Sequence, residues 1–208
     1  MSTVRKASPS RRAQNKLDKR ERIRKAAFEL FVKHGFDATT TKAVARRAKI
    51  ASGTLFLYAK DKRDLLFLVF GERLRSTVDA QMATLPRQAA LLDQLMHVFG
   101  GLFRMYGEQP ELSAAFVKHL PGAQGPNADS VNGLTLSFLH QVSMLVQSAQ
   151  TRGEVDAEVP PMVAAGNIFS LYFGALMTWL SGFATLEAAL EPGLRDALSL
   201  QIRGLSPR

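Results

Sequence analysis

Apolar residues recur at helical spacing along most of the chain, and no segment shows the strict alternation that is typical of a half-buried strand. The first apolar stripe predicts a helix from about Lys16 to His34, with Ile23 and Phe31 on its inner face. Gly35 follows directly and is expected to end this helix, because glycine adopts the left-handed backbone conformation at little cost.

Two short helical segments come next. The three threonines at 39–41 offer an N-cap for a helix of about two turns. After a break at 49–51, residues 52–58 form a second segment that is too short to stand alone. Asp61, with Asp64 three residues later, resembles a capping box that starts a longer helix. Two short helices braced by a longer one on each side predict a helix-turn-helix, whose second short helix enters a major groove of DNA.

The chain beyond residue 86 is apolar and is interrupted by proline and glycine. Further apolar stripes predict helices that contain Leu92, Val131, Ile168 and Leu194. The whole pattern indicates an all-α fold of about nine helices, with a three-helix head followed by a larger helical domain. We expect a disordered basic arm at 1–15, a helix-turn-helix DNA-binding domain at 16–63 and the larger domain at 64–208.

Positive charge is concentrated at the amino-terminal end. Residues 1–63 hold 18 of the 27 Lys and Arg residues but only 5 of the 18 Asp and Glu residues, so the remainder is mildly acidic. This asymmetry indicates a polyanionic partner at one end of the molecule. A structural helical hairpin with solvated charges would explain neither the clustering nor the order of the motifs. Within the arm, Arg5, Lys6, Arg11 and Arg12 either enter a minor groove or form a solvated tail.

An ordered set of short motifs follows Gly35: the paired threonines, Val44-Ala45, Gly53-Thr54-Leu55, Tyr58 and Lys60-x-Lys62. With the preceding helix, the run from about Arg20 to Phe70 resembles the DNA-binding head of the TetR family of bacterial repressors. Each motif alone is weak, but together and in order they are specific, over a quarter of the chain. The resemblance implies a cytoplasmic homodimer that binds a palindromic operator in double-stranded DNA, usually as a ligand-released repressor.

Individual roles follow from the resemblance position by position. Lys42, Ser52 and Gly53 match positions that contact bases. Four residues match phosphate contacts: Thr41, Thr54, Tyr58 and Lys62. A hydroxyl suits a phosphate oxygen at a helix N-terminus, and lysine supplies a charge-assisted hydrogen bond.

The sequence departs from the family pattern at four positions. Lys49 replaces the turn glycine, which is costly if the position still needs a positive φ angle. Ala51 stands where a small polar cap precedes the second short helix, and losing such a cap costs about 0.5–2 kcal/mol. Phe56 replaces a phosphate-binding tyrosine, and Ala59 replaces a larger apolar residue. We expect these changes to affect the operator sequence and local stability, not the fold.

An uncharged run extends from Val159 to Leu186 and is long enough to span a bilayer. Its flanks are acidic and it opens with two prolines, which disfavours a membrane span. We interpret it as a helix that packs against both its own core and a partner subunit. In the family, the final two helices form the dimer interface. The expected interface residues are the small-residue ridge and part of the last apolar stripe: Gly166, Ser170, Gly174, Thr178, Leu194 and Leu198.

The resemblance also implies that the domain at 64–208 senses a ligand. Eight large side chains are candidate walls of an inducer pocket, although plain core explains each of them better: Phe99, Phe103, Tyr106, Phe116, Phe138, Met144, Tyr172 and Trp179. Few charged residues are available to line a cavity there, which favours a small, mostly apolar inducer.

Catalytic and metal-binding patterns are absent from the sequence. The four histidines are scattered without metal-ligand spacing, and there is no glycine-rich phosphate loop or nucleophile elbow. The chain has no cysteine, which excludes disulfides and thiolate zinc sites. We therefore expect neither an enzyme nor a bound cofactor. Two rivals stay open: a nucleic-acid binder without sequence preference, and a membrane-associated helical protein.

Overall fold

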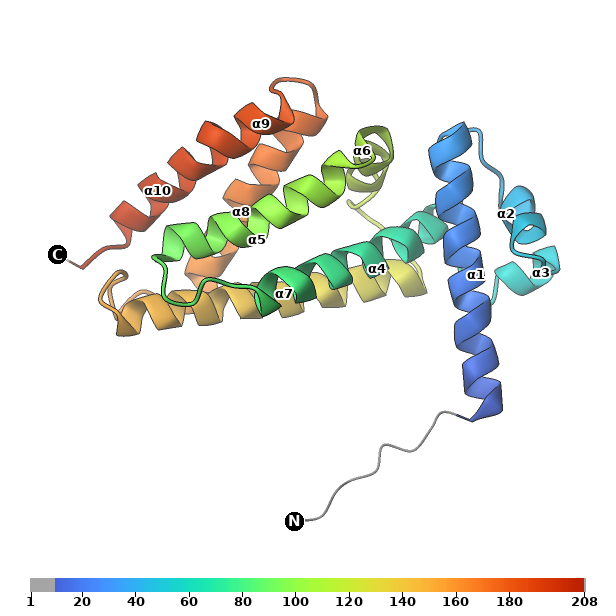
Figure 1. Ribbon diagram of the computed structural model, residues 1–208, viewed down its shortest axis with the longest axis horizontal. Coiled ribbons are helices and arrows are strands. Elements are labelled where there is room, and N and C mark those ends of the chain that lie inside the picture. Colours follow the sequence, from blue (N-terminus) through green and yellow to red (C-terminus); the bar gives the residue numbers. More distant parts are fainter. Residues whose placement is uncertain (1–9, 208) are drawn as a thin grey trace, which may run out of the picture.

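The computed structural model describes residues 10–207, and within this range the protein is helical without a strand (Figure 1). The head consists of α1 (Arg11–His34), α2 (Thr41–Arg47) and α3 (Ser52–Leu55). The larger domain contains α4 (Lys62–Ala83), α5 (Leu91–Gly107), α6 (Pro110–Lys118), α7 (Pro126–Thr151) and α8 (Pro161–Leu180). A final run joins α9 (Leu186–Ala188), a π-helical stretch (Ala189–Leu194) and α10 (Arg195–Gly204), and it bends at Glu191. Counting that run as one helix, residues 10–207 form the nine helices expected from the sequence.

The first helix begins earlier than the apolar pattern indicates. Residues 11–15, expected within a disordered arm, are helical, and the Ser10 side chain caps them by accepting a hydrogen bond from the Ala13 backbone N–H. The apolar period gives no sign of this segment because all of its side chains face solvent. Residues 1–9, and with them Arg5 and Lys6, lie outside the described residues. The predicted end at Gly35 is confirmed, with φ at 80°.

The three helices of the head pack around one small core. Ile23 and Phe31 of α1, Val44 of α2 and Leu55 of α3 are all at most 1% exposed. Thr39 closes the end of α1, because its buried hydroxyl donates to the carbonyls of Leu30 and Gly35. Thr40 caps α2 as expected, its side chain accepting a hydrogen bond from the Ala43 N–H. The expected bracing of two short helices by longer neighbours is confirmed.

The larger domain is a bundle in which α4, α5, α7 and α8 pack around an aromatic core. The ring of Phe99 on α5 stacks on Tyr172 of α8 at 4.6 Å between centroids, and Phe70 of α4 stacks on Phe116 of α6 at 4.3 Å. These aromatic pairs join helices that are distant in sequence, and such pairs contribute about 0.5–1.5 kcal/mol beyond burial. α4 and α7 lie side by side and reach from this bundle to the head (Figure 1).

Candidate functional site

The base-contacting candidates lie on the outer surface of the head. Lys42 at the start of α2, and Ser52 and Gly53 at the start of α3, are all exposed. A methyl group at position 53 would meet no atom within 4 Å, and the backbone there needs no positive φ. The fold therefore does not require glycine at position 53. A close approach of another molecule to the backbone of α3 gives a physical reason for it.

The turn between α2 and α3 contains a strained residue. Lys49 has φ at 55°, the only positive φ outside glycine among residues 10–207. The turn is a Schellman motif, in which the Lys49 N–H donates to the Arg46 carbonyl and the Ile50 N–H to the Ala45 carbonyl. The residue with positive φ in a Schellman motif is normally glycine, so Lys49 has the steric cost that we expected at this position. Ala51 likewise gives α3 no side-chain cap.

The phosphate-contacting candidates differ in their exposure and in the hydrogen bonds that they already make. Thr41, Thr54 and Tyr58 are half-buried around the two short helices. The Lys62 ammonium already donates to the carbonyls of Phe36 at 3.0 Å and Asp37 at 2.9 Å. It also lies 4.6 Å from the centre of the Phe36 ring. Lys62 thus fastens the loop after α1 to the start of α4, and only one of its three donors is left for a phosphate.

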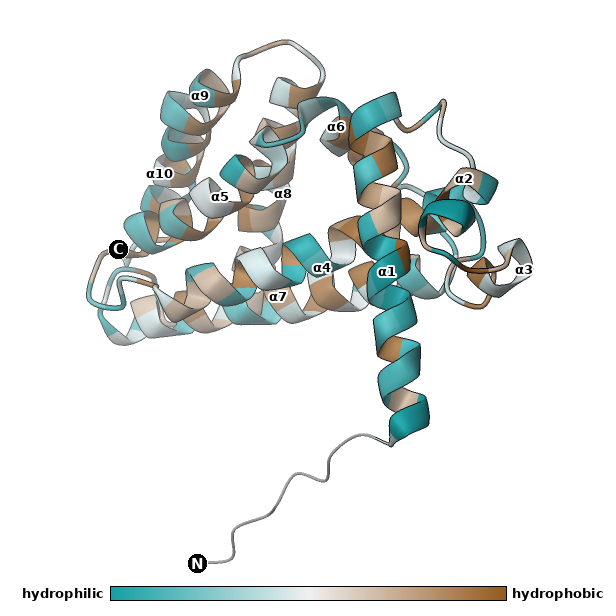
Figure 2. Ribbon diagram, turned by 45° about the vertical axis from the view of Figure 1, so that its right-hand side comes forward, coloured by the Kyte–Doolittle hydropathy of each residue, from teal (hydrophilic) through white to brown (hydrophobic). Residues whose placement is uncertain are grey.

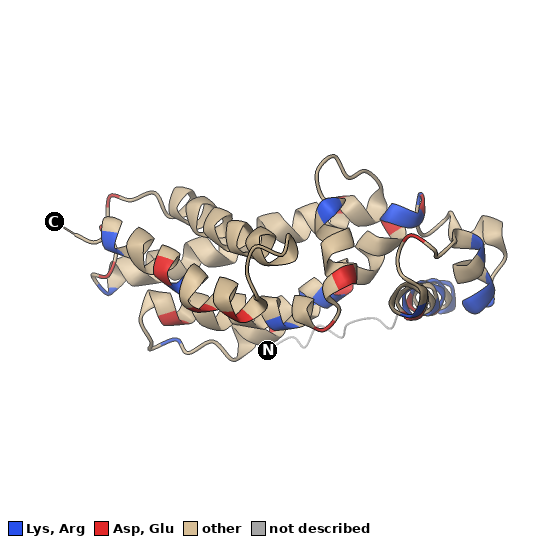
Figure 3. Cartoon of the chain, turned by 90° about the horizontal axis from the view of Figure 1, so that it is seen from above, with Lys and Arg blue, Asp and Glu red and all other residues tan. Residues whose placement is uncertain are grey.

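Positive charge surrounds the exposed face of the head. Figure 3 shows Lys and Arg positions, coloured blue, gathered at the end of the molecule that α1, α2 and α3 form. Arg24 and Arg47 are neutralised by Glu21 and Glu29. In residues 10–207, by contrast, no ion pair involves Lys42 or Arg46, and the same holds for Lys49, Lys60 and Arg63. This face can bind a phosphate backbone.

A buried carboxylate joins the head to the larger domain. Asp64 of α4 is 0% exposed and accepts hydrogen bonds from the backbone N–H groups of Lys60, Asn127 and Ala128. The Asn127 side chain also donates to Asp64 at 3.0 Å and to the Tyr58 carbonyl at 2.8 Å. Asp64 therefore caps the N-terminus of α7, where a negative charge is favourable, while holding the turn after α3. Gly125 permits this approach, because a Cβ there would lie 2.7 Å from the Asp64 carboxylate.

The capping box expected at Asp61 and Asp64 is formed only on one side. The Asp61 carboxylate accepts a hydrogen bond from the Asp64 N–H at 2.8 Å, as expected. The Asp64 side chain does not return to the Asp61 N–H and binds α7 instead. Nothing in the local sequence pairs Asp64 with residues more than sixty positions later, so sequence reasoning missed this junction.

An apolar cavity lies in the larger domain, between α4, α5, α6, α7 and α8. Its volume is about 70 Å³, and its walls include Leu74, Val78, Leu102, Thr135 and Phe173. Of the eight walls expected from the sequence, four line it: Tyr106, Phe116, Phe138 and Tyr172. Phe99 and Phe103 are fully buried core beside Tyr172, and Trp179 stacks on Phe103. Met144 was wrongly expected at this wall, because it is 51% exposed on the outer face of α7.

Two phenols are the main polar groups of this cavity. Burial raises the pKa of Tyr106, partly offset by a hydrogen bond with Tyr172. Burial also raises the pKa of Tyr172 well above its ordinary value, and the neighbouring Tyr106 adds to the effect. Both groups are therefore neutral hydroxyls at physiological pH. The third polar wall, Thr135, already donates its hydroxyl to the Val131 carbonyl. The cavity suits an apolar group that carries few polar atoms.

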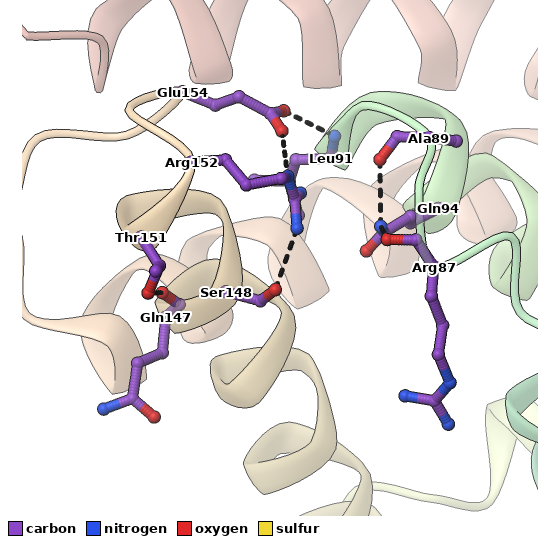
Figure 4. Close-up of polar contacts among 9 residues, drawn as sticks. All are labelled: Arg87, Ala89, Leu91, Gln94, Gln147, Ser148, Thr151, Arg152 and Glu154. Atoms are coloured by element: carbon purple, nitrogen blue, oxygen red, sulfur yellow. Dashed lines mark hydrogen bonds and ion pairs between the residues drawn. The ribbon is translucent and has the colours of Figure 1, made fainter.

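A second hollow, with both polar and apolar walls, lies at the end of the bundle far from the head, between the α4–α5 loop and α7. Figure 4 shows the polar contacts in this region. Arg152 bridges Glu154 and the Ser148 hydroxyl, and Glu154 accepts a hydrogen bond from the Leu91 N–H. The buried Gln94 amide donates to the carbonyls of Arg87 and Ala89 and so shapes the loop. These contacts hold the start of α5 to the end of α7.

One face of α8 is left uncovered. Gly174, Ser170 and Thr178 are exposed and Gly166 is half-buried, and the two hydroxyls donate to carbonyls one turn earlier in the same helix. The ridge is therefore smooth and has little unmet hydrogen-bonding capacity. Met162, Val163 and Met177 beside it are 39–61% exposed. A subunit could pack closely on this face.

Leu194 and Leu198 were wrongly expected on the same interface. Both are 0% exposed within the single chain, because the apolar stripe of the last helix faces α5 and α8 of its own domain. The periodicity identified a buried face correctly but could not say which surface covers it.

Two further features concern other classes of function. α8 is the one helix in the described part of the chain that is long and apolar enough to cross a membrane, and 28% of its most apolar window is buried. Within residues 10–207, no group of three or more His, Cys, Asp or Glu side chains is placed to hold a metal ion.

The chain is similar in sequence to known bacterial regulators. The family described as bacterial regulatory proteins, tetR family, matches residues 23–69, which comprise most of the head and the first part of α4. The fatty acid metabolism regulator protein of Bacillus subtilis is 21% identical over 155 residues, covering 74% of this chain and 80% of that protein. The transcriptional repressor KstR of Mycobacterium tuberculosis is 28% identical over 167 residues, covering 79% of this chain and 72% of that protein.

A solved structure extends the similarity to the whole fold. Thermus thermophilus FadR, a TetR-family transcriptional repressor in complex with lauroyl-CoA, superimposes with a TM-score of 0.73. The two chains are 22% identical, and the match covers 91% of this chain and 96% of that chain. At this identity the likeness shows a shared fold.

Proposed function

This chain belongs to the TetR family of bacterial regulatory proteins, and from that premise we propose that it is a homodimeric repressor released from a palindromic operator by a mostly apolar ligand. The observation that carries the DNA-binding part is the exposure of Lys42, Ser52 and Gly53 on two braced short helices. Free cationic side chains surround these residues, so phosphate contacts position the head while α3 reads base edges.

The proposed dimer forms through the uncovered face of α8. A smooth ridge of small side chains permits close helix approach, and exposed Met162, Val163 and Met177 supply apolar area. A partner subunit accounts for this exposure better than a bilayer does, because the acidic flanks of α8 provide no basic anchors. A two-fold axis through α8 would present two heads to one duplex, as a palindrome requires. We place this regulator in the cytoplasm.

The proposed ligand is an acyl group of the fatty acyl thioester class. The support is the apolar cavity with its two neutral phenols, together with relatives named for fatty acid metabolism and for a complex with lauroyl-CoA. The cavity has a volume of about 70 Å³, which is less than half of the roughly 150 Å³ of an apolar cavity that binds benzene. An acyl chain therefore enters only if the surrounding helices separate.

That separation supplies a mechanism for release. Leu74 and Val78 on one wall belong to α4, and Thr135 and Phe138 on another belong to α7. The same two helices meet the head at Asp64, which binds the N-terminus of α7 and the turn after α3. Widening the cavity thus moves the two supports of the head, and DNA affinity falls if the widened state spaces the heads wrongly for the operator.

The test uses the DNA upstream of the protein's own coding region. Fluorescence anisotropy of that duplex should show binding by the protein and release by lauroyl-CoA. Thr135→Phe, which fills the cavity, should bind DNA as the wild type does and resist release by at least tenfold in ligand concentration. Ser137→Phe, on the outer face of α7, is the matched control and should be released normally. Release of Thr135→Phe at the wild-type concentration would contradict the proposed cavity.

A further inference from the structure

The amino-terminal turns of α1 project from the head without packing on it. Every residue from Arg11 to Lys19 is exposed, and Ile23 is the first buried residue of the helix. Figure 2 shows this end as a hydrophilic helix that extends beyond α2 and α3. An isolated helical segment of this length is marginal in water, because tertiary packing supplies most helix stability. Its local support is the Ser10 cap and a hydrogen bond from Gln14 to Asp18.

A hollow of about 850 Å³ separates this projecting segment from the end of α3. One side of it consists of five polar side chains of α1: Arg11, Arg12, Asn15, Lys16 and Lys19. The other side consists of Leu57 and Tyr58. The five residues recur at intervals of three and four positions and so share one face of the helix. We call this hollow the α1–α3 groove.

The α1–α3 groove carries uncompensated positive charge. Its four cationic side chains form no ion pair within residues 10–207. The acidic residue of the segment, Asp18, is not among the lining residues and pairs with Gln14. Like charges at helical spacing repel one another, so this face is stabilised when a polyanion neutralises it. Across the groove, Leu57 is 79% exposed and offers an apolar surface.

We propose that the α1–α3 groove holds the sugar–phosphate backbone of the DNA that flanks each half-site. This inference rests on the proposed function, because α3 must lie on a duplex for the flanking strand to reach the groove. The cations then contact successive phosphates while Leu57 packs against a deoxyribose. The helix rises about 12 Å from Arg11 to Lys19, which equals three to four base pairs at about 3.4 Å each. The operator footprint is therefore extended by that length on both sides.

The experiment compares two charge-matched triple variants. Arg12→Ala/Lys16→Ala/Lys19→Ala removes three cations of the groove. Arg75→Ala/Arg104→Ala/Arg203→Ala removes three exposed cations from α4, α5 and α10 of the larger domain. Alanine favours helix, so neither triple should weaken its helices. The affinity of each protein is measured against salt concentration on two duplexes, one containing the half-sites with flanks and one trimmed by four base pairs at each end.

On the flanked duplex, the groove variant should lower the salt-dependence slope by about 2.7 for each bound head, because each phosphate that is no longer neutralised lowers it by about 0.9. The control triple should keep the wild-type slope. On the trimmed duplex all three proteins should have the same slope, and the preferred half-site sequence should not change.

Three outcomes would overturn the inference. If the groove and control triples share one slope on the flanked duplex while the wild type binds it, the groove makes no backbone contact and the proposed function stands. If the groove variant shows the same decrease in slope on the trimmed duplex, the charge acts through general attraction and not at the flank. If the wild type binds no duplex selectively, the proposed function fails, and the inference fails with it.

Discussion

At the scale of single residues, a substitution of Gly53 should change stability and DNA affinity in opposite directions. Replacing it by alanine should stabilise the protein by up to about 1 kcal/mol, because the position is helical and a Cβ meets no neighbour. The same change should weaken operator binding at least tenfold, because the methyl group would hold the backbone of α3 away from DNA.

Gly133→Ala is the matched control for this prediction. Gly133 is helical and exposed on α7, and it too has open space around it. The control should be stabilised without any loss of DNA affinity, as measured by urea unfolding and by anisotropy. Equal DNA affinity of Gly53→Ala and the wild type would exclude close contact at this position.

Lys49 stores strain in the turn between the two short helices. Lys49→Gly should raise the free energy of unfolding by about 1 kcal/mol, because glycine adopts a φ of 55° without the steric cost that a side chain brings. Lys49→Ala removes the same charge and keeps the strain, so it should give no such gain. The two variants are compared by urea unfolding, and equal stability would show that the turn is not strained.

How far single residues could be predicted depends on whether their partners are local. The family pattern identified position 49 as one that needs glycine, because a Schellman turn is encoded within six residues. The roles of Lys62 and Asp64 could not be read in the same way. Lys62 is expected to contact a phosphate, and it also donates to carbonyls 25 and 26 positions earlier. Only the packed fold brings such groups together.

At the scale of elements, the junction of α4 and α7 depends on one buried carboxylate. Asp64→Asn should lower the free energy of unfolding by about 2–4 kcal/mol, because an amide cannot accept from all four N–H donors and loses the charge that favours the start of α7. Asp79→Asn, an exposed change on the same helix, should stay within about 0.5 kcal/mol of the wild type. Urea unfolding measures both variants. Equal midpoints for the two would show that the Asp64 junction does not stabilise the fold.

The apolar period predicted where the helices lie, but it did not predict which surface covers each of them. It located the helices because each buries an apolar stripe, and it found the caps at Thr40 and Asp61 because these are local. It missed residues 11–15 of α1, whose helix buries nothing. It also could not tell that the stripe containing Leu194 and Leu198 faces its own domain, since covered surfaces look the same whether the cover is the same chain or a partner.

For the whole molecule, the uncovered face of α8 determines the oligomeric state that we propose. Ser170→Glu should produce a folded monomer, because the position is exposed in the single chain but central in the small-residue ridge. Ser137→Glu, the same change on the exposed side of α7, should remain a dimer. Sedimentation velocity measures both, and circular dichroism checks that both are folded. A dimer of Ser170→Glu with wild-type affinity would place the interface elsewhere.

We propose that the two heads of a dimer read a palindrome through α3, and a selection from random DNA duplexes at fixed salt is the decisive test. We expect the wild-type protein to enrich one inverted repeat. Lys42→Ala or Ser52→Ala should change the preference at particular base pairs and leave the preference at the other base pairs unchanged. Enrichment of no common sequence, with binding that depends on salt alone, would contradict this proposal.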